Sequence, residues 1–134
     1  MNTSHPSIRY HIECINDGQL EVMREIMAPE FVNLATGFDP MHGVDAMIAA
    51  VKSILEGFPG CHSEIQTTLD EGDRFAVQWR ITGKHDGVFQ GVAPTGLDVD
   101  IGGIHIDTIA DDRITTRYAY NNFPLVMAKL RQGA

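Results

Sequence analysis

Apolar and polar residues alternate without interruption along one stretch near the middle of the chain. Phe75, Val77, Trp79 and Ile81 are separated by Ala76, Gln78, Arg80 and Thr82. A period of two places each set on its own face of a β-strand, so the stretch predicts a strand with one buried face. A second alternating run extends from Val99 to Ile106 and contains the Gly102-Gly103 pair. Paired glycines within a strand indicate a bulge or a sharp bend, as a strongly curved sheet requires.

Helical periodicity is clearest between Val44 and Phe58. Apolar residues recur there at intervals of three and four, which predicts an amphipathic helix packed on the core. Shorter helical stretches are predicted from Pro6 and from Pro124. Helices thus come first, long antiparallel strands follow, and a short helix ends the chain. That order predicts an α+β fold with helices on one face of a curved sheet, in a single domain over residues 1–134.

The charge and hydropathy of the chain limit its partners. A formal net charge of −8 disfavours nucleic acids, because their binding depends on a basic surface. No apolar run approaches the roughly 18 residues of a membrane helix, and the N-terminus lacks a secretory signal pattern. We therefore expect a cytoplasmic protein that binds neither nucleic acid nor membrane.

Sequence motifs for metals and nucleotide cofactors are missing. Cys14 and Cys61 lie far apart and are predicted to be buried thiols. The six histidines lack the spacing of metal ligands, and neither a phosphate-binding loop nor a dinucleotide glycine motif occurs. We expect no metal and no cofactor.

A loop predicted over residues 36–43 carries Phe38 and Met41. An aromatic ring and a flexible thioether in such a loop are suited to a lid over a pocket. They are equally suited to covering the edge of the core, and the sequence leaves both interpretations open.

The segment from Gly83 to Gly96 reads G-K-H-D-G-V-F-Q-G-V-A-P-T-G. It resembles the core motif of the SnoaL-like polyketide cyclases and their ester-cyclase relatives. The resemblance runs from about Asn16 to Leu130, with further counterparts at Gly43, Phe58-Pro59-Gly60, Glu71-Gly72-Asp73, Trp79 and Asp112-Arg113-Ile114. It implies a cystatin-like, nuclear transport factor 2-like cone, the fold of the ketosteroid isomerases. In that fold a curved antiparallel sheet wraps around N-terminal helices and encloses a pocket. The resemblance also implies a small apolar or aromatic substrate and favours a homodimer.

Two positions depart from the family pattern. Tyr118 stands where a Trp is usual, and Asn122 stands where the polyketide cyclases carry an Asp as general acid/base. The preceding residue, Asn121, is also an amide. An amide does not exchange a proton at neutral pH, although it can donate a hydrogen bond to a developing oxyanion. The proton-transfer group must therefore be sought elsewhere.

The strand predicted over Gly103–Ile109 offers substitutes. His105 and Asp107 are two residues apart and share one face of a strand. On the pocket side, His105 would be the base of an intramolecular aldol closure, with Asp107 as its orienter or as a second acid. In the alternative, Ile104 and Ile106 point inward and both polar side chains face solvent or a dimer partner. A bulge at the glycine pair reverses the register, so alternation favours neither arrangement.

Neighbouring strands supply the remaining site candidates. Asn122 and Tyr120 are predicted oxyanion donors, and the predicted ligand-binding residues are Trp79, His85, Tyr118, Phe38 and Met41. Structural alternatives exist for these residues. Trp79 could belong to the core, the tyrosine hydroxyls could face water, and His85 could only pin the glycine-rich turn by a hydrogen bond.

Three functions follow as hypotheses. The first is a cofactor-independent polyketide cyclase that closes a polyketide ester by an intramolecular aldol reaction. The second is an isomerase or hydrolase of a small apolar substrate on the same fold. The third is a binding protein that kept the pocket and lost the proton shuttle, as Asn122 suggests. A buried titratable group with a shifted pKa in the pocket would favour an enzyme.

Overall fold

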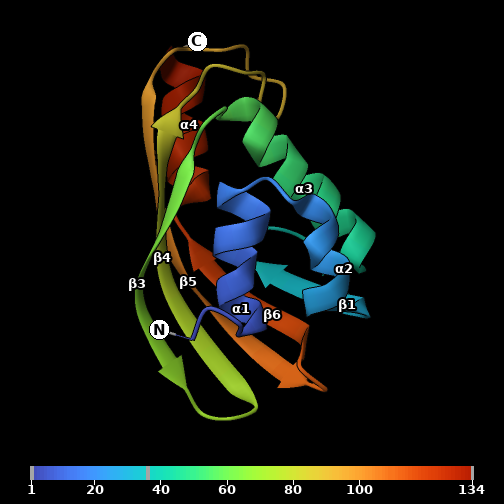
Figure 1. Ribbon diagram of the computed structural model, residues 1–134. Coiled ribbons are helices and arrows are strands. Elements are labelled where there is room, and N and C mark those ends of the chain that lie inside the picture. Colours follow the sequence, from blue (N-terminus) through green and yellow to red (C-terminus); the bar gives the residue numbers. More distant parts are fainter. Residues whose placement is uncertain (1, 36, 134) are drawn as a thin grey trace.

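The structure is a computed structural model that describes residues 2–35 and 37–133. Its helical segments are α1 (Pro6–Arg9), η1 (Tyr10–Asn16), η2 (Leu20–Val22), α2 (Met23–Ile26), α3 (Val44–Gly57) and α4 (Phe123–Gly133). Its strands are β1 (Met27–Ala35), β2 (Met41–His42), β3 (His62–Asp70), β4 (Arg74–Lys84), β5 (Asp98–Ala110) and β6 (Arg113–Asn121). The helical segments from α1 to α3 lie on one side of the strands (Figure 1).

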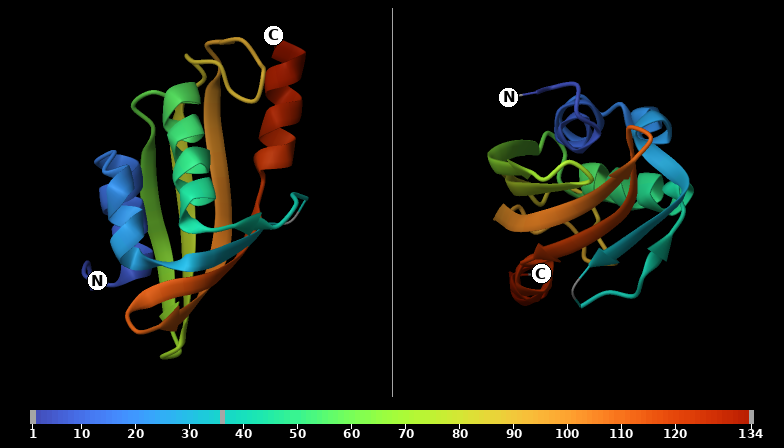
Figure 2. Two further views of the ribbon diagram at one scale, coloured as in Figure 1. Left: turned by 90° about the vertical axis from the view of Figure 1, so that its right-hand side faces the viewer. Right: turned by 90° about the horizontal axis from the view of Figure 1, so that it is seen from below.

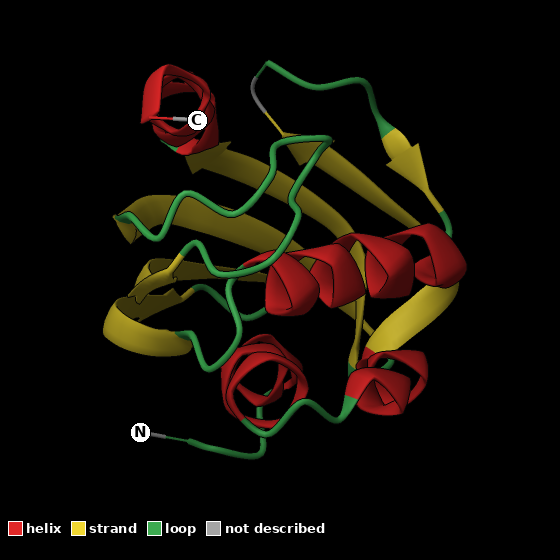
Figure 3. Ribbon diagram, turned by 90° about the horizontal axis from the view of Figure 1, so that it is seen from above, coloured by secondary structure: helices red, strands yellow, loops and turns green. Residues whose placement is uncertain are grey.

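Six strands form one sheet in the order β2-β1-β6-β5-β4-β3. All neighbouring strands pair antiparallel except β1 and β6, which run parallel. The sheet is thus mixed, where the sequence predicted an antiparallel one. Hairpin turns impose antiparallel pairing only on strands that follow one another in the chain, and β1 meets β6 after a long crossover. Figures 2 and 3 show the sheet curving around α3 and the N-terminal helical segments.

The pairing of β4 with β5 explains the glycine pair. It is continuous over all 11 residues of β4, so no bulge forms at Gly102-Gly103. A Cβ at Gly103 would instead collide with the carbonyl oxygen of Tyr120 in β6. The glycine therefore permits close contact between two strands, as glycine within a strand often does.

Continuous pairing also fixes which side chains of β5 point inward. Since no residue is inserted, the alternation persists along the strand, and His105 and Asp107 are buried beneath the helices while Ile104 is exposed. The alternative in which Ile104 and Ile106 point inward is therefore wrong.

The predicted helices are found, with differences at their ends. The helix predicted over Val44–Phe58 is α3, which ends at Gly57 and leaves Phe58 fully buried behind it. The N-terminal helical stretch is mostly the π-helix η1, a form that often occurs at functional sites. Within the described residues, no helix is long and apolar enough to cross a membrane.

The predicted loop over residues 36–43 differs in one respect. Met41 and His42 form the short strand β2, which pairs with β1. Thr36 lies outside the described residues. The remaining loop residues bring Phe38 beside the space between sheet and helices.

Candidate active site

A cavity of about 220 Å³ lies between the sheet and the helices. Seven polar residues of its wall come from η1 and four strands: Tyr10, His11, Asn33, Trp79, His105, Arg117 and Asn121. Asp39, Ser53 and Gln90 also line it. Apolar side chains such as Met47 and Ile54 of α3 cover the opposite side. The cavity is thus a mainly apolar enclosure with a few polar groups, the usual character of a small-molecule site.

Three of the predicted ligand-binding residues are placed in this cavity. Trp79 forms part of its wall from β4, and Phe38 and Met41 approach it from the loop after β1 and from β2. This placement is compatible with a lid, and Met41 also packs against the core, so both interpretations of the loop stay open. Their contact with a ligand stays a prediction.

Tyr118, Tyr120 and Asn122 were predicted on the wrong face. The two tyrosines are 39% and 58% exposed on the outer face of β6, because Arg117, Ala119 and Asn121 take the inward positions. Alternation showed which residues of β6 share a face, but it could not show which face is buried.

Asn122 serves the backbone rather than the cavity. Its Oδ1 accepts a hydrogen bond from the Gly102 N–H at 3.0 Å, and its Nδ2 donates to the Asp100 carbonyl at 3.3 Å. The inward neighbour Asn121 uses its Oδ1 to accept from the Phe123 N–H at 3.0 Å, at the start of α4. The prediction of Asn122 as an oxyanion donor in the cavity is therefore not supported by its position.

His85 is fully buried under the glycine-rich loop and is not part of the cavity wall. Its Nδ1 accepts hydrogen bonds from the hydroxyl and the backbone N–H of Thr95, at 2.9 and 3.2 Å. The structural alternative, in which His85 pins the turn, describes its place correctly.

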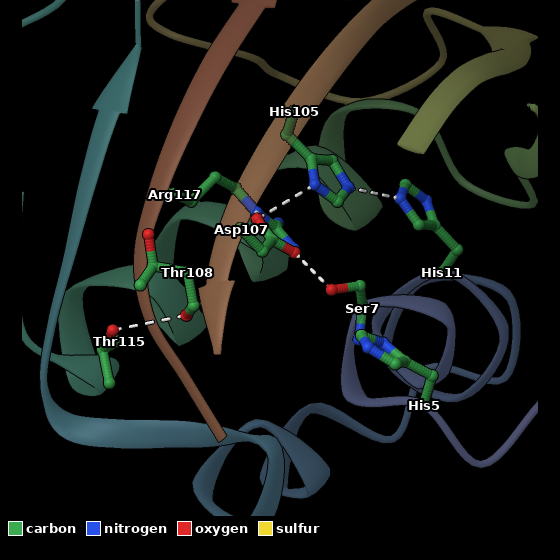
Figure 4. Close-up of polar contacts among 8 residues, drawn as sticks. All are labelled: His5, Ser7, His11, His105, Asp107, Thr108, Thr115 and Arg117. Carbon is green, nitrogen blue, oxygen red and sulfur yellow. Dashed lines mark hydrogen bonds and ion pairs between the residues drawn. The ribbon is translucent and has the colours of Figure 1, made fainter. Parts of the chain in front are cut away.

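Asp107 is the centre of a buried polar network (Figure 4). Arg117 donates from Nε to Oδ1 at 2.8 Å and from Nη2 to Oδ2 at 3.0 Å. Ser7 Oγ donates to Oδ2 at 2.6 Å, and His105 Nδ1 lies 3.0 Å from Oδ1. Burial raises the pKa of Asp107, but the charges and hydrogen bonds of Arg117 and His105 outweigh it and hold this pKa well below its usual range. Asp107 is therefore an anion paired with a cation in the interior.

The hydrogen-bond partners assign the tautomers of two histidines. The carboxylate of Asp107 only accepts, so His105 carries its proton on Nδ1 and a lone pair on Nε2. His11 Nε2 lies 2.8 Å from this lone pair and must donate to it. His11 Nδ1 then accepts from the hydroxyl of Ser63 at 2.8 Å. The result is one continuous chain of hydrogen bonds from Ser63 to Asp107.

Both histidines are neutral in this arrangement. Burial, His105 and Arg117 together hold the pKa of His11 well below its ordinary value. Burial and Arg117 lower the pKa of His105, and Asp107 only partly offsets them. A neutral imidazole can accept a proton or donate one hydrogen bond, so the pair can serve general acid/base chemistry.

Sequence reasoning identified His105 and Asp107 but missed His11, Ser7 and Arg117. His11 lies among apolar residues at helical spacing, where a polar side chain gives no sign of its orientation. One usable signal was the i, i+4 relation of Ser7 and His11, which places both on one helix face. Arg117 also packs its guanidinium 4.1 Å from the centroid of the Tyr10 ring. Among the described residues, no His, Cys, Asp or Glu cluster is arranged to hold a metal.

Comparisons with known proteins agree with this fold. A family profile described as SnoaL-like polyketide cyclase matches residues 7–130. The crystal structure of a SnoaL-like protein from Jannaschia sp. CCS1 has 31% identity over 93% of this chain and 88% of that one, with a TM-score of 0.84. IdmH of Streptomyces antibioticus, a candidate polyketide cyclase, has 24% identity over 98% of this chain and 99% of its own, with a TM-score of 0.80.

TsrD of Streptomyces laurentii has the same fold, with 18% identity over 97% of this chain and 96% of its own and a TM-score of 0.80. No match to the chain was found among curated proteins. The resemblance read from Gly83–Gly96 and its surroundings is confirmed by the profile and by the structure from Jannaschia. The chain belongs to the SnoaL-like polyketide cyclase family and has its nuclear transport factor 2-like fold.

Proposed function

We propose that the chain is a cofactor-independent acid/base enzyme that closes a ring in a polyketide ester by an intramolecular aldol reaction. The observation that carries this proposal is the His11–His105 pair in the cavity wall, with its two Nε2 atoms 2.8 Å apart. Family membership supports the substrate class, which is a small, largely apolar polyketide ester.

His105 is the base in this proposal. A proton flanked by two carbonyl groups is fairly acidic, so a neutral imidazole is strong enough to remove it. The proton passes to His105 Nε2, and the C–H electron pair becomes the enolate. Asp107 accepts the hydrogen bond of His105 Nδ1 and so stabilises the imidazolium that forms, as the Asp of a catalytic triad does.

His11 is the electrophile. Its Nε2–H donates to His105 in the free protein and turns to the substrate carbonyl oxygen when a ligand enters, which frees the His105 lone pair. Its lowered pKa keeps His11 neutral, so its N–H can donate a hydrogen bond to the enolate oxygen as negative charge develops there. His105 Nε2 thus removes the proton from the C–H group, and His11 Nε2–H donates a hydrogen bond to the adjacent carbonyl oxygen.

Ring closure completes the cycle. The enolate carbon attacks a second carbonyl of the same molecule and forms a C–C bond, and the new alkoxide takes the proton back from His105 Nε2. The overall reaction is an isomerisation that consumes no co-reactant. The apolar wall contributed by α3 excludes water and strengthens each of these polar interactions.

Two alternatives carry less support. The hypothesis of a non-catalytic binding protein predicts a cavity without titratable groups, whereas His11 and His105 line this cavity. An isomerase of a small apolar substrate would use the same base without a ring closure.

The test is turnover of an aromatic polyketide β-keto ester in D₂O, followed by product formation and by deuterium uptake at the ring-forming carbon. We expect His105→Ala to lower both rates by about 10²–10⁴-fold, the usual contribution of a general base. His62→Ala removes an exposed imidazole from β3 and should leave both unchanged. Full activity of the His105 variant would refute the assignment.

We also propose that the protein is a homodimer that pairs through the outer face of β5 and β6. Ile104 and Tyr120 are directly opposite each other there, as are Ile106 and Tyr118. Three of these four side chains are exposed. Contiguous apolar surface of this kind is typical of association sites, and a second copy presenting the same face gives a two-fold interface.

A further inference from the structure

Among the described residues, two polar atoms of side chains that line the cavity have no hydrogen-bond partner. They are the carboxamide oxygen of Asn33 and the indole Nε1 of Trp79. The side chains are only 8% and 7% exposed. A buried indole N–H usually finds a partner, and leaving a buried polar group unpaired is costly. Two such atoms on residues that line one cavity are therefore candidates for pairing with a bound ligand.

A third atom of this kind, Nε2 of His85, lies outside the cavity wall. The atoms of Asn33 and Trp79 differ from His85 Nε2 because their residues line the cavity. They also differ from each other in their hydrogen-bonding role. The carboxamide oxygen of Asn33 can only accept a hydrogen bond, and the indole N–H of Trp79 can only donate one.

Strand register places Asn33 and Trp79 on opposite sides of His105. Asn33 of β1 is paired with Arg117 of β6, and Trp79 of β4 is paired with Gly103 of β5. Between these two levels lies the pair formed by His105 and Ala119. Two whole strands, β6 and β5, also separate β1 from β4 in the sheet. A ligand that meets both atoms must therefore extend past His105.

We infer that Asn33 and Trp79 determine ligand specificity by holding two ends of one molecule. A hydroxyl at one end donates to Asn33 Oδ1, and a carbonyl at the other accepts from Trp79 Nε1. Ala119 lies between these ends beside His105 and gives a rigid, flat ligand a small side chain to lie on. The inference rests on the proposed function, because it names the polar pattern that the substrate of this same site carries.

Trp79 lies close to His11, one of the two histidines of the proposed reaction. Its ring centroid is 6.1 Å from that of His11, so a carbonyl held by the indole N–H lies near the proposed electrophile. Asn33 lies at the level of Arg117, on the other side of His105. A ligand held at both ends is thus fixed in its direction relative to the base.

The experiment uses four naphthalenes of nearly equal shape and isothermal titration calorimetry of the whole protein. 6-Acetyl-2-naphthol has a hydroxyl and a carbonyl at opposite ends. 2-Acetyl-6-methoxynaphthalene and 2-acetylnaphthalene lack the hydroxyl donor, and 6-ethyl-2-naphthol lacks the carbonyl acceptor. We expect 6-acetyl-2-naphthol to bind about ten-fold more tightly than each of the other three, as one unpaired buried polar group would require.

Two variants assign each preference to its residue. In Asn33→Leu the preference for the hydroxyl should disappear while the preference for the carbonyl remains, and in Trp79→Phe the reverse should hold. Asn33→Leu also removes an unpaired buried polar atom, so its melting temperature should not fall. A folded Asn33→Leu protein with weaker hydroxyl recognition separates a role in specificity from a role in stability.

Equal affinities for the four compounds, or no binding of 6-acetyl-2-naphthol, would overturn the inference. A preference for the methoxy compound over the hydroxyl compound would overturn the acceptor role of Asn33. None of the compounds can undergo the aldol closure, so binding is measured apart from turnover. Selective binding together with failure of the deuterium assay would refute the proposed reaction and leave the specificity residues in place.

Discussion

His11 and His105 face each other in the buried interior, and their neutrality makes each a weaker base than a free imidazole. The same burial that keeps His105 available as a base lowers its affinity for protons. Arg117 adds to this effect while it keeps Asp107 ionised. The site therefore combines a fixed ion pair, which orients, with two uncharged rings, which can exchange a proton.

These lowered pKa values predict that the protein loses stability in mild acid. Both histidines have an ordinary pKa of 6.5 when the chain unfolds and a lower one when it is folded. The unfolded chain therefore binds more protons below pH 6.5, and the free energy of unfolding falls as the pH drops from there toward the folded-state pKa. If both histidines take up a proton on unfolding, the free energy of unfolding changes by up to about 2.7 kcal/mol per pH unit.

Urea unfolding between pH 5 and 8 measures this slope. His11→Gln should reduce it by about one proton. An unchanged slope in the His11 variant would mean that His11 is protonated in the folded state.

The sequence predicted part of this site for a clear physical reason. His105 and Asp107 are two residues apart on a strand, and a period of two places them on one face whatever the rest of the fold does. Their partner His11 comes from a different element, and its orientation depends on how η1 packs against β5. Local periodicity carries no information on that packing, so the second half of the pair appeared only in the structure.

At the level of elements, the contact between β5 and β6 decides which residues enter the cavity. Gly103 allows the two strands to approach, and its pairing with Asn121 sets the inward positions of β6. The sequence identified both strands but assigned the tyrosines of β6 to the cavity. Alternation has two equivalent solutions, and only the pairing partners choose between them.

Gly103→Ala should destabilise the protein by about 1–3 kcal/mol, the usual cost of overpacking. The new Cβ would collide with the Tyr120 carbonyl oxygen and come within 2.9 Å of the Asn121 Cβ. Gly102→Ala is the matched control, because its nearest neighbour would be the Trp79 carbonyl oxygen at 3.7 Å, an ordinary contact. Denaturant unfolding compares the two, and equal free energies would contradict the close-packing role of Gly103.

At the scale of the whole molecule, helical and strand periodicities predicted the α+β class, with helices packed on one face of a curved sheet. These periodicities could not predict the parallel pairing of β1 with β6, because it joins segments more than eighty residues apart. The cavity was expected from the family resemblance alone. Its polar pattern depends on side chains from several helices, strands and loops that no single periodicity connects.

The exposed outer face of the sheet predicts the oligomeric state. Tyr120→Glu places a charge at the centre of the patch formed with Ile104 and Tyr118, so it should convert the proposed homodimer to a monomer. Light scattering after size-exclusion chromatography measures the mass. Leu69→Glu changes another exposed apolar residue, outside this patch, and should leave the dimer intact. A monomeric parent protein would refute the proposal.

The hydrogen bond between His11 and His105 joins residues 94 positions apart in the chain. During synthesis, η1 and α3 leave the ribosome long before β5 exists. A nascent chain can therefore have formed most of its helices while His105, the partner of His11, is still missing. The ends of so long a loop must meet before the pair can form, and contacts of this kind come late and slowly in folding. The proposed acid/base pair is thus complete only late in assembly, and no single segment of the chain contains it.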